Sequence, residues 1–277
     1  MNSSDDYTEQ LIDSIDDFPS LDPIVSRVIL LVSDPDSSAR MIAHEIAKDA
    51  GLAARILRLS NSALFGHVRQ ISNLEHAVVV LGTQEIFNLV IRTATFDFMQ
   101  SGTDRLLFER LWRHFVTTAT AAHNLARNWS GEARDLAYLG GLLHDIGKVV
   151  FSMAMPEEYS ALLNDHPITP GGILEPEHDR FGCDHLLLGR KLLEHWNFPP
   201  LLVNVAGNHH GNTSESSGKT GYLRLVEIAD LLAHSIHGYR PETTELEGVL
   251  SELGIDDETW SGWRKQVGER SDLELSI

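Results

Sequence analysis

The stretch GLLHDIGK occupies residues 141–148 and carries the clearest chemical signal in the chain. It lies within an apolar run, residues 136–153, that we expect to form one helix. Adjacent histidine and aspartate on a helix can direct an imidazole nitrogen and a carboxylate oxygen toward one cation. Such a mixed nitrogen and oxygen set suits Fe, Mn, Zn or Ni better than Ca or Mg. His144 and Asp145 are therefore the first candidates for a metal site, whereas an isolated His-Asp pair is more often a pair of surface residues.

Several other histidines could join this pair. The chain has 14 histidines, and eleven of them lie between residues 114 and 237. His114 lies in the middle of a helix predicted over residues 106–129. His185 opens a later helix, and His209 and His210 are adjacent near the end of the next one. These positions could bring four more imidazoles to the same centre.

Asp230 lies in the apolar stretch VEIADLL, residues 226–232. A carboxylate buried in such a helix must be paired or metal-bound, because an isolated buried charge is very costly. The alternative is that Asp230 lies on the solvent side of its helix. It is therefore a candidate ligand whose burial decides its role.

The rest of the chain also predicts helices. Apolar residues recur at helical spacing over most of its length, and no stretch alternates with a period of two for long enough to predict a strand. Glycines at positions 140, 141 and 147 would weaken the helix over residues 136–153 unless close packing uses them. Residues 156–183 contain several prolines and glycines and are expected to be rich in loops. The expected fold is all-α.

The formal net charge of −18 is concentrated at the two ends. Lys plus Arg number 22 and Asp plus Glu number 40, and residues 1–17 and 240–277 each contribute −6. This balance argues against binding to nucleic acid through a broad basic face. A helix-turn-helix over residues 36–65, with Arg55 and Arg58 on a recognition helix, is disfavoured for the same reason. An anionic small molecule would need local positive charge, which a bound metal could supply.

The remaining composition predicts a cytoplasmic protein without membrane insertion. The first 17 residues hold six acidic residues and no Lys or Arg, unlike a signal peptide. No run of about 18 uncharged apolar residues is present. The single cysteine, Cys183, excludes an internal disulfide and fits a reducing compartment.

His114, His144-Asp145 and Asp230 resemble the H…HD…D pattern of the HD superfamily of metal-dependent phosphohydrolases. More specifically, the chain resembles an HDOD domain, the "HD-related output domain" of bacterial signalling proteins. The resemblance rests on the following segments: FPSLDP (18–23), IAKD (46–49), LAARILRLSNSALF (52–65), ISNL (71–74), residues 77–82, HDIGK (144–148), FGCDH (181–185), WNFP (196–199) and HH (209–210).

This resemblance implies a domain organisation and a mode of action. It implies an acidic N-terminal segment over residues 1–17, an N-terminal helical bundle over 18–103, an HD-domain-like helical core over 104–239, and a C-terminal helical tail over 240–277. HDOD domains act as output or scaffolding modules through protein partners. They are related to the HD-GYP phosphodiesterases, which cleave cyclic di-GMP, but many have lost part of the metal site.

Seven ligand positions of the HD-GYP pattern hold matching residues in this chain. The resemblance implies metal ligation by His114, His144, Asp145, His185, His209, His210 and Asp230. Asp145 would bridge two cations, with His114, His144 and Asp230 on one and His185, His209 and His210 on the other. Lys148 matches the lysine that contacts the substrate phosphate, so Lys148 and Asp145 are the candidate catalytic residues. The alternative is a structural metal, or a polar core without one.

Two departures from HD-GYP limit what can be carried over. Arg110 occupies the position of a glutamate that helps to hold a third metal. No Gly-Tyr-Pro motif follows His210. Two metals are therefore expected, with a third as the alternative, and recognition of cyclic di-GMP is doubtful.

Residues beyond the ligands are assigned only by sequence proximity. Asp184 and Glu227 are candidates to orient ligating histidines, and His234, one turn after Asp230, could face the same cavity. The other histidines, at positions 44, 76, 123, 166, 178, 195 and 237, are expected to be surface or satisfied core residues. Cys183 is expected to fill space before a helix rather than to act as a reactive thiol.

Three functions remain open at this point. The first is a signalling module that keeps a metal centre and acts through protein partners. The second is an active phosphohydrolase on a cyclic nucleotide or another phosphodiester, which would bind a phosphate-containing small ligand. The third is a metal or redox sensor in which metal occupancy changes partner binding.

Overall fold

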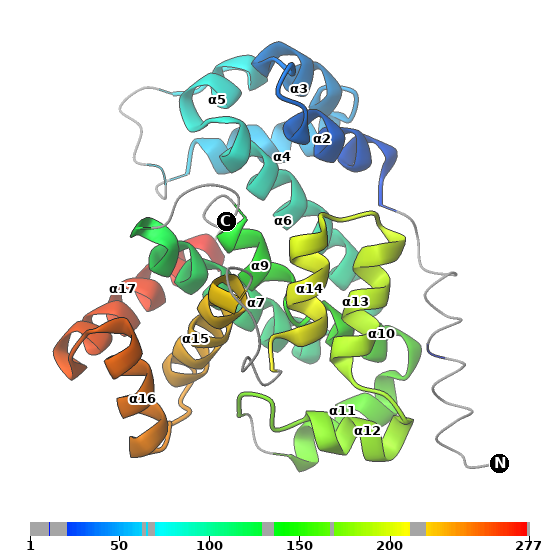
Figure 1. Cartoon of the computed structure of the whole chain (residues 1–277). Helices are drawn as coiled ribbons and strands as arrows, with labels where there is room; N and C mark the ends of the chain where they lie inside the picture. The colour runs from blue at the N-terminus through cyan, green and yellow to red at the C-terminus, as the bar shows by residue number, and fades with distance from the viewer. Residues whose placement is uncertain are drawn as a thin grey trace. The chain divides into compact units, whose positions relative to one another are not determined.

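The computed structural model describes residues 11, 21–62, 65, 70–128, 136–166, 169–210 and 220–275. These residues form helices and connecting turns with no strand among them, which confirms the all-α prediction (Figure 1). The acidic segment at residues 1–17, apart from Leu11, lies outside the described residues, as do residues 63–64, 66–69 and 211–219. Contacts divide the chain into two compact units, residues 19–101 with 273–277 and residues 1–18 with 102–272.

The unit built on residues 19–101 is a small bundle of capped helices. Its helices are α2 (Pro23–Ser33), α3 (Ala39–Ile46), α4 (Ala50–Ser60), α5 (Leu74–Leu81) and α6 (Thr83–Gly102). Asp22, Ser38, Asp49 and Asn73 each accept a hydrogen bond from a backbone N–H in the first turn of the helix that follows. Ile42, Ile46 and Ile56 are fully buried between these helices, whereas Leu30, Met41, Val79 and Val80 are exposed.

The other unit holds the predicted ligands. Its elements are α7 (Arg105–Leu125), the 3₁₀ helix η1 (Ala126–Asn128), α9 (Ala137–Leu143), α10 (Ile146–Ala154), α11 (Pro156–Asp165), α12 (Leu174–Phe181), α13 (His185–His195), α14 (Pro200–Asn208), α15 (Thr220–Ile236), α16 (Thr243–Leu253) and α17 (Asp257–Leu275). Helix α7 packs against α9 and α15, while α13 packs against α10 and α14. This packing brings five segments that carry candidate ligands to one place (Figure 1).

Glycines make the closest of these contacts possible. A Cβ at Gly141 would lie 2.6 Å from the backbone oxygen of Thr118 on α7, and one at Gly147 would overlap the backbone oxygen of His185 on α13. Gly140 similarly faces the hydroxyl of Tyr222 on α15. The glycines at positions 140, 141 and 147 therefore do have the close-packing role that would offset their cost in a helix.

The prediction of a single helix over residues 136–153 is wrong in one respect. The chain forms two helices there, α9 and α10, with a break at His144 and Asp145, where Asp145 has φ −100° and ψ 14°. In a continuous helix, adjacent residues diverge by about 100° around the axis. The break allows both side chains to face the same point, and the apolar periodicity on either side conceals it.

Residues 156–183 are also more helical than expected. Pro156 stands at the first position of α11, where its missing N–H costs nothing, so here proline starts a helix rather than interrupting one. Gly182 has φ +77° and ends α12.

Among the described residues, no single helix has the length and apolar character needed to cross a membrane, although α5 and α6, bent by 116°, meet that criterion jointly.

Candidate metal centre

The candidate ligands come from five parts of the fold and converge in two groups. His114 projects from the middle of α7, His144 and Asp145 from the α9–α10 break, and His185 from the start of α13. His209 and His210 follow α14, and Asp230 lies on α15. One group comprises His114, His144 and Asp230, and the other comprises Asp145, His185, His209 and His210. Within each group the candidate ligand atoms lie within 4.8 Å of one another.

The two imidazoles of the first group face the carboxylate of Asp230 and also that of Asp145, which belongs to the second group. The Nε2 atom of His114 is 3.1 Å from Oδ1 of Asp230 and 3.5 Å from Oδ2 of Asp145. The Nε2 atom of His144 is 3.6 Å and 3.3 Å from the same two oxygens. All four side chains are buried, which decides against a solvent-facing Asp230.

In the second group, imidazoles surround the other oxygen of Asp145. The Nε2 atoms of His185 and His209 are each 3.3 Å from its Oδ1. His210 lies beside them, with its ring centroid 4.1 Å from that of His209. The two oxygens of Asp145 thus face different groups, which is the arrangement a bridging carboxylate requires.

Hydrogen bonds on the far side of the rings show which nitrogen carries the proton. The Nδ1 atoms of His144 and His209 lie 2.8 Å and 3.1 Å from the backbone oxygens of Gly141 and Val205. A nitrogen that faces a carbonyl oxygen must be the N–H. In the neutral ring Nε2 is then a bare acceptor, and it points at a carboxylate oxygen, which is also an acceptor.

This clustering of acceptors fits a cation. The buried Nε2 atoms of His114, His144, His185 and His209, and the Oδ1 atoms of Asp145 and Asp230, have no hydrogen-bond partner. Buried polar atoms normally have one. Nitrogen and carboxylate oxygen together are the donors that divalent transition metals prefer. The residues present therefore form two groups whose donor atoms suit a metal ion.

The charges of the cluster support the same conclusion. Burial alone would raise the pKa of Asp145, but His144 and Lys148 hold it well below its usual range. Burial likewise would raise the pKa of Asp230, but His234 and His114 keep it low. Burial lowers the pKa of His209 to about 4. In His144 burial acts in the same direction, but Asp145 and Asp230 outweigh it and raise the pKa to about 10, so this ring takes up a proton when no other cation faces the two carboxylates. The centre therefore holds two ionised carboxylates, and buried carboxylates require cations.

Glu177 holds His185 of the second group in place. Its role could not be predicted from proximity to the ligands in the sequence. It is fully buried, and its Oε2 accepts hydrogen bonds from the backbone N–H of His185 at 2.8 Å and from Nδ1 of the same residue at 2.6 Å. Its Oε1 accepts one from the hydroxyl of Tyr159 at 2.6 Å. Carboxylate–histidine pairs of this kind orient metal ligands.

The expected orienting residues have other partners. Asp184 caps α13 by accepting from the N–H of Leu187, and Glu227 pairs with Arg224 on the same helix. Cys183 is buried, as expected of a space-filling residue. His44, His76, His178 and His195 are exposed.

Lys148 lies at the edge of the centre. Its Nζ is 2.6 Å from Oδ2 of Asp145. Burial alone would lower the pKa of Lys148, but the nearby carboxylates of Asp145 and Glu177 raise it, so the ammonium keeps its charge. Lys148 is thus a fixed positive charge one hydrogen bond away from the candidate bridging carboxylate.

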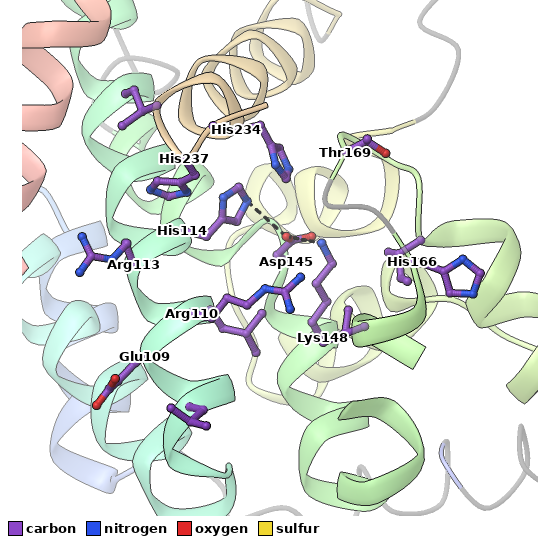
Figure 2. A pocket seen from close by; sticks show the side chains of 16 residues that line it. Glu109, Arg110, Arg113, His114, Asp145, Lys148, His166, Thr169, His234 and His237 are labelled. Atoms are coloured by element: carbon purple, nitrogen blue, oxygen red, sulfur yellow. Dashed lines mark hydrogen bonds and ion pairs between the residues drawn. The ribbon is translucent and has the colours of Figure 1, made fainter. Parts of the chain in front are cut away.

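A pocket of about 720 Å³ opens over His114, Asp145 and Lys148 (Figure 2). Its walls include Arg110, Arg113, His166, His234 and His237, together with apolar side chains. The guanidinium of Arg110 points toward Lys148, whereas Glu109 points away (Figure 2) and pairs with Arg105 at 3.0 Å. The pocket is therefore locally cationic in a chain with a strongly negative net charge.

The comparisons with known proteins agree with this fold. Residues 18–212 match the HDOD domain family. An uncharacterized protein of Treponema pallidum is 27% identical over 251 residues, which cover 90% of this chain and 48% of that protein. The chain spans about half the length of the curated relatives it matches.

Two solved structures show the same fold at low sequence identity. A candidate phosphohydrolase from Shewanella amazonensis superimposes with a TM-score of 0.72 at 23% identity, covering 95% of this chain and 96% of that one. A candidate signal transduction protein from Marinobacter aquaeolei also gives a TM-score of 0.72, at 21% identity over 99% of this chain and 65% of that one. On the strength of the match over residues 18–212, the chain belongs to the HDOD domain family.

Proposed function

We propose that this chain is a metal-binding bacterial signalling protein that acts mainly through protein partners. The observation that carries the proposal is the set of buried, unpartnered imidazole and carboxylate acceptors around Asp145. His114, His144 and Asp230 would hold one divalent transition metal, and His185, His209 and His210 a second, with Asp145 between them. When bound, the metals would supply Lewis-acid stabilisation of negative charge and a cross-link between helices.

The cross-link gives metal occupancy a structural consequence. The ligands belong to α7, the α9–α10 break, α13, the end of α14, and α15. Without cations, their facing acceptors repel one another, so the packing of these helices depends on the metals. A surface formed by the same helices could therefore report metal occupancy to a protein partner.

The similarity to the M. aquaeolei protein, described as a candidate signal transduction protein, supports this role. The test uses the full chain as bait, with and without chelator, beside Asp145→Ala. Partners that are retained only by the metal-loaded wild type support the proposal. Equal recovery by all three preparations would argue that the metal centre has no part in partner binding.

Metal-dependent phosphoester hydrolysis is a second candidate, favoured by the cationic pocket beside the centre. Lys148 would bind and stabilise charge on phosphoryl oxygens, and Arg110 would orient the same group through its planar guanidinium. The S. amazonensis structure, described as a candidate phosphohydrolase, is consistent with this. Hydrolysis of bis(4-nitrophenyl) phosphate with Mn or Fe, lost in Asp145→Ala, would establish turnover and replace the scaffold proposal.

Arg110 also bears on the number of metals. Its guanidinium points into the pocket near Lys148 (Figure 2), and no hydrogen bond or ion pair to another described residue offsets its charge. Two fixed cations disfavour a third metal at this position. We therefore propose two metals, and we propose no specificity for cyclic di-GMP.

A further inference from the structure

His234 lies between the first ligand group and the pocket. It follows Asp230 by four residues on α15, so the two side chains leave the same face of the helix. Its Nε2 is 3.3 Å from Oδ1 of Asp230, and its ring centroid is 4.6 Å from that of His114. It is buried but lines the pocket, where it points toward Asp145 (Figure 2).

We propose that His234 is a further ligand of the first metal, on the side that faces the pocket. This inference rests on the proposed metal-binding function. A single cation would then be surrounded by His114, His144, Asp230 and His234, and Asp145 would bridge it to the second cation. The pocket side of this metal would then be closed by a protein ligand.

The distances place His234 in the same shell as the other two imidazoles. The Nε2 atoms of His114, His144 and His234 lie 3.1, 3.6 and 3.3 Å from Oδ1 of Asp230. For metal–ligand bonds of about 2.1 Å, neighbouring ligand atoms are about 3.0 Å apart in an octahedron and about 3.4 Å apart in a tetrahedron. A histidine that only oriented Asp230 would donate a hydrogen bond to it, yet Oδ1 of Asp230 has no hydrogen-bond partner.

His234 could also leave the metal without breaking a second hydrogen bond of its ring. The rings of His144 and His185 are fixed on the far side by hydrogen bonds from Nδ1 to Gly141 and Glu177. The Nδ1 atom of His234 is buried and has no hydrogen-bond partner. Its ring is therefore held mainly through Nε2. A phosphate group that entered the pocket would compete with His234 for the metal, so His234 would act as an internal inhibitor of anion binding.

The test compares wild type, His234→Ala, His234→Gln and His178→Gln. His178 is exposed on α12 and lies outside the pocket lining, so it is the matched control. Each protein is titrated with Co²⁺, followed by visible absorption and calorimetry, and the metal-loaded proteins are then titrated with inorganic phosphate. The glutamine variant retains a polar side chain if the alanine variant folds poorly.

Loss of His234 should weaken the first site on the order of tenfold or more, change the Co²⁺ absorption band, and strengthen phosphate binding, while His178→Gln behaves as wild type. A Co²⁺ titration and spectrum unchanged in both His234 variants would overturn this inference and leave the proposed function intact. A weakened first site without stronger phosphate binding would support the ligand and contradict the inhibitory role. A wild type that takes up no metal would contradict the proposed function itself, and this inference with it.

Discussion

At the scale of single residues, Glu177 shows how the second group is kept ready for a metal. Its carboxylate holds Nδ1–H of His185 at 2.6 Å and leaves Nε2 facing Asp145. Glu177→Gln should weaken the second site by about tenfold to a hundredfold, because the charge that strengthens the ligand is lost. Calorimetric titration with Mn or Zn measures the effect. Glu175→Gln, on the exposed side of α12, should leave both sites unchanged, and equal losses in the two variants would contradict the orienting role.

Arg110 is expected to act on the bound anion and not on the metals. Arg110→Gln should weaken phosphate binding to the metal-loaded protein by about tenfold or more, the value of one charge-assisted hydrogen bond, with unchanged metal content. Arg105→Gln is the matched control, because Arg105 lies on the same helix, is highly exposed and is paired with Glu109. If both variants bound phosphate as tightly as wild type, Arg110 would have no role in anion binding.

At the scale of helices, the contact between α10 and α13 positions His185. Gly147→Ala would place a methyl group against the backbone oxygen of His185 and 2.7 Å from the backbone nitrogen of Gly189. Overpacking of this kind costs about 1–3 kcal/mol. We therefore expect a lower free energy of unfolding in denaturant titration, together with weaker binding at the second site.

A matched control lies on α16, where a Cβ at Gly248 would meet no atom within 4 Å. Gly248→Ala should stabilise the protein by about 0.5–1 kcal/mol through its higher helix propensity. If Gly147→Ala were stabilising to the same extent, the close packing of α10 against α13 would be disproved.

The helices also show what sequence patterns could and could not predict. Helical periodicity correctly predicted the all-α fold. The resemblance to the HD superfamily united His114, His144, Asp145 and Asp230 as candidate ligands, and the structure brings them together. The break at His144 was missed, because the apolar pattern continues through it. Glu177 was missed because its contact with His185 depends on the turn between α12 and α13 and on Tyr159, which no local pattern encodes.

At the scale of the whole molecule, metal binding should stabilise the fold. A ligand present at 100 times its Kd adds about 2.7 kcal/mol, which for a chain of this size corresponds to about 5–10 °C in Tm. Thermal denaturation of metal-loaded wild type with and without chelator should show this difference. The Asp145→Ala variant should show no difference in Tm between the two conditions. If chelator lowered its Tm as much as that of the wild type, the stabilising metal would lie away from Asp145.

The central claim is that two metals lie on either side of Asp145, and anomalous diffraction tests it most directly. Crystals grown with Mn, Fe or Zn would be measured on both sides of the absorption edge of the added metal. We expect two anomalous peaks, one among His114, His144 and Asp230 and one among His185, His209 and His210. Crystals that contain the metal but show no anomalous peak at these residues would contradict the account. Metal bound only elsewhere in the chain would contradict it as well.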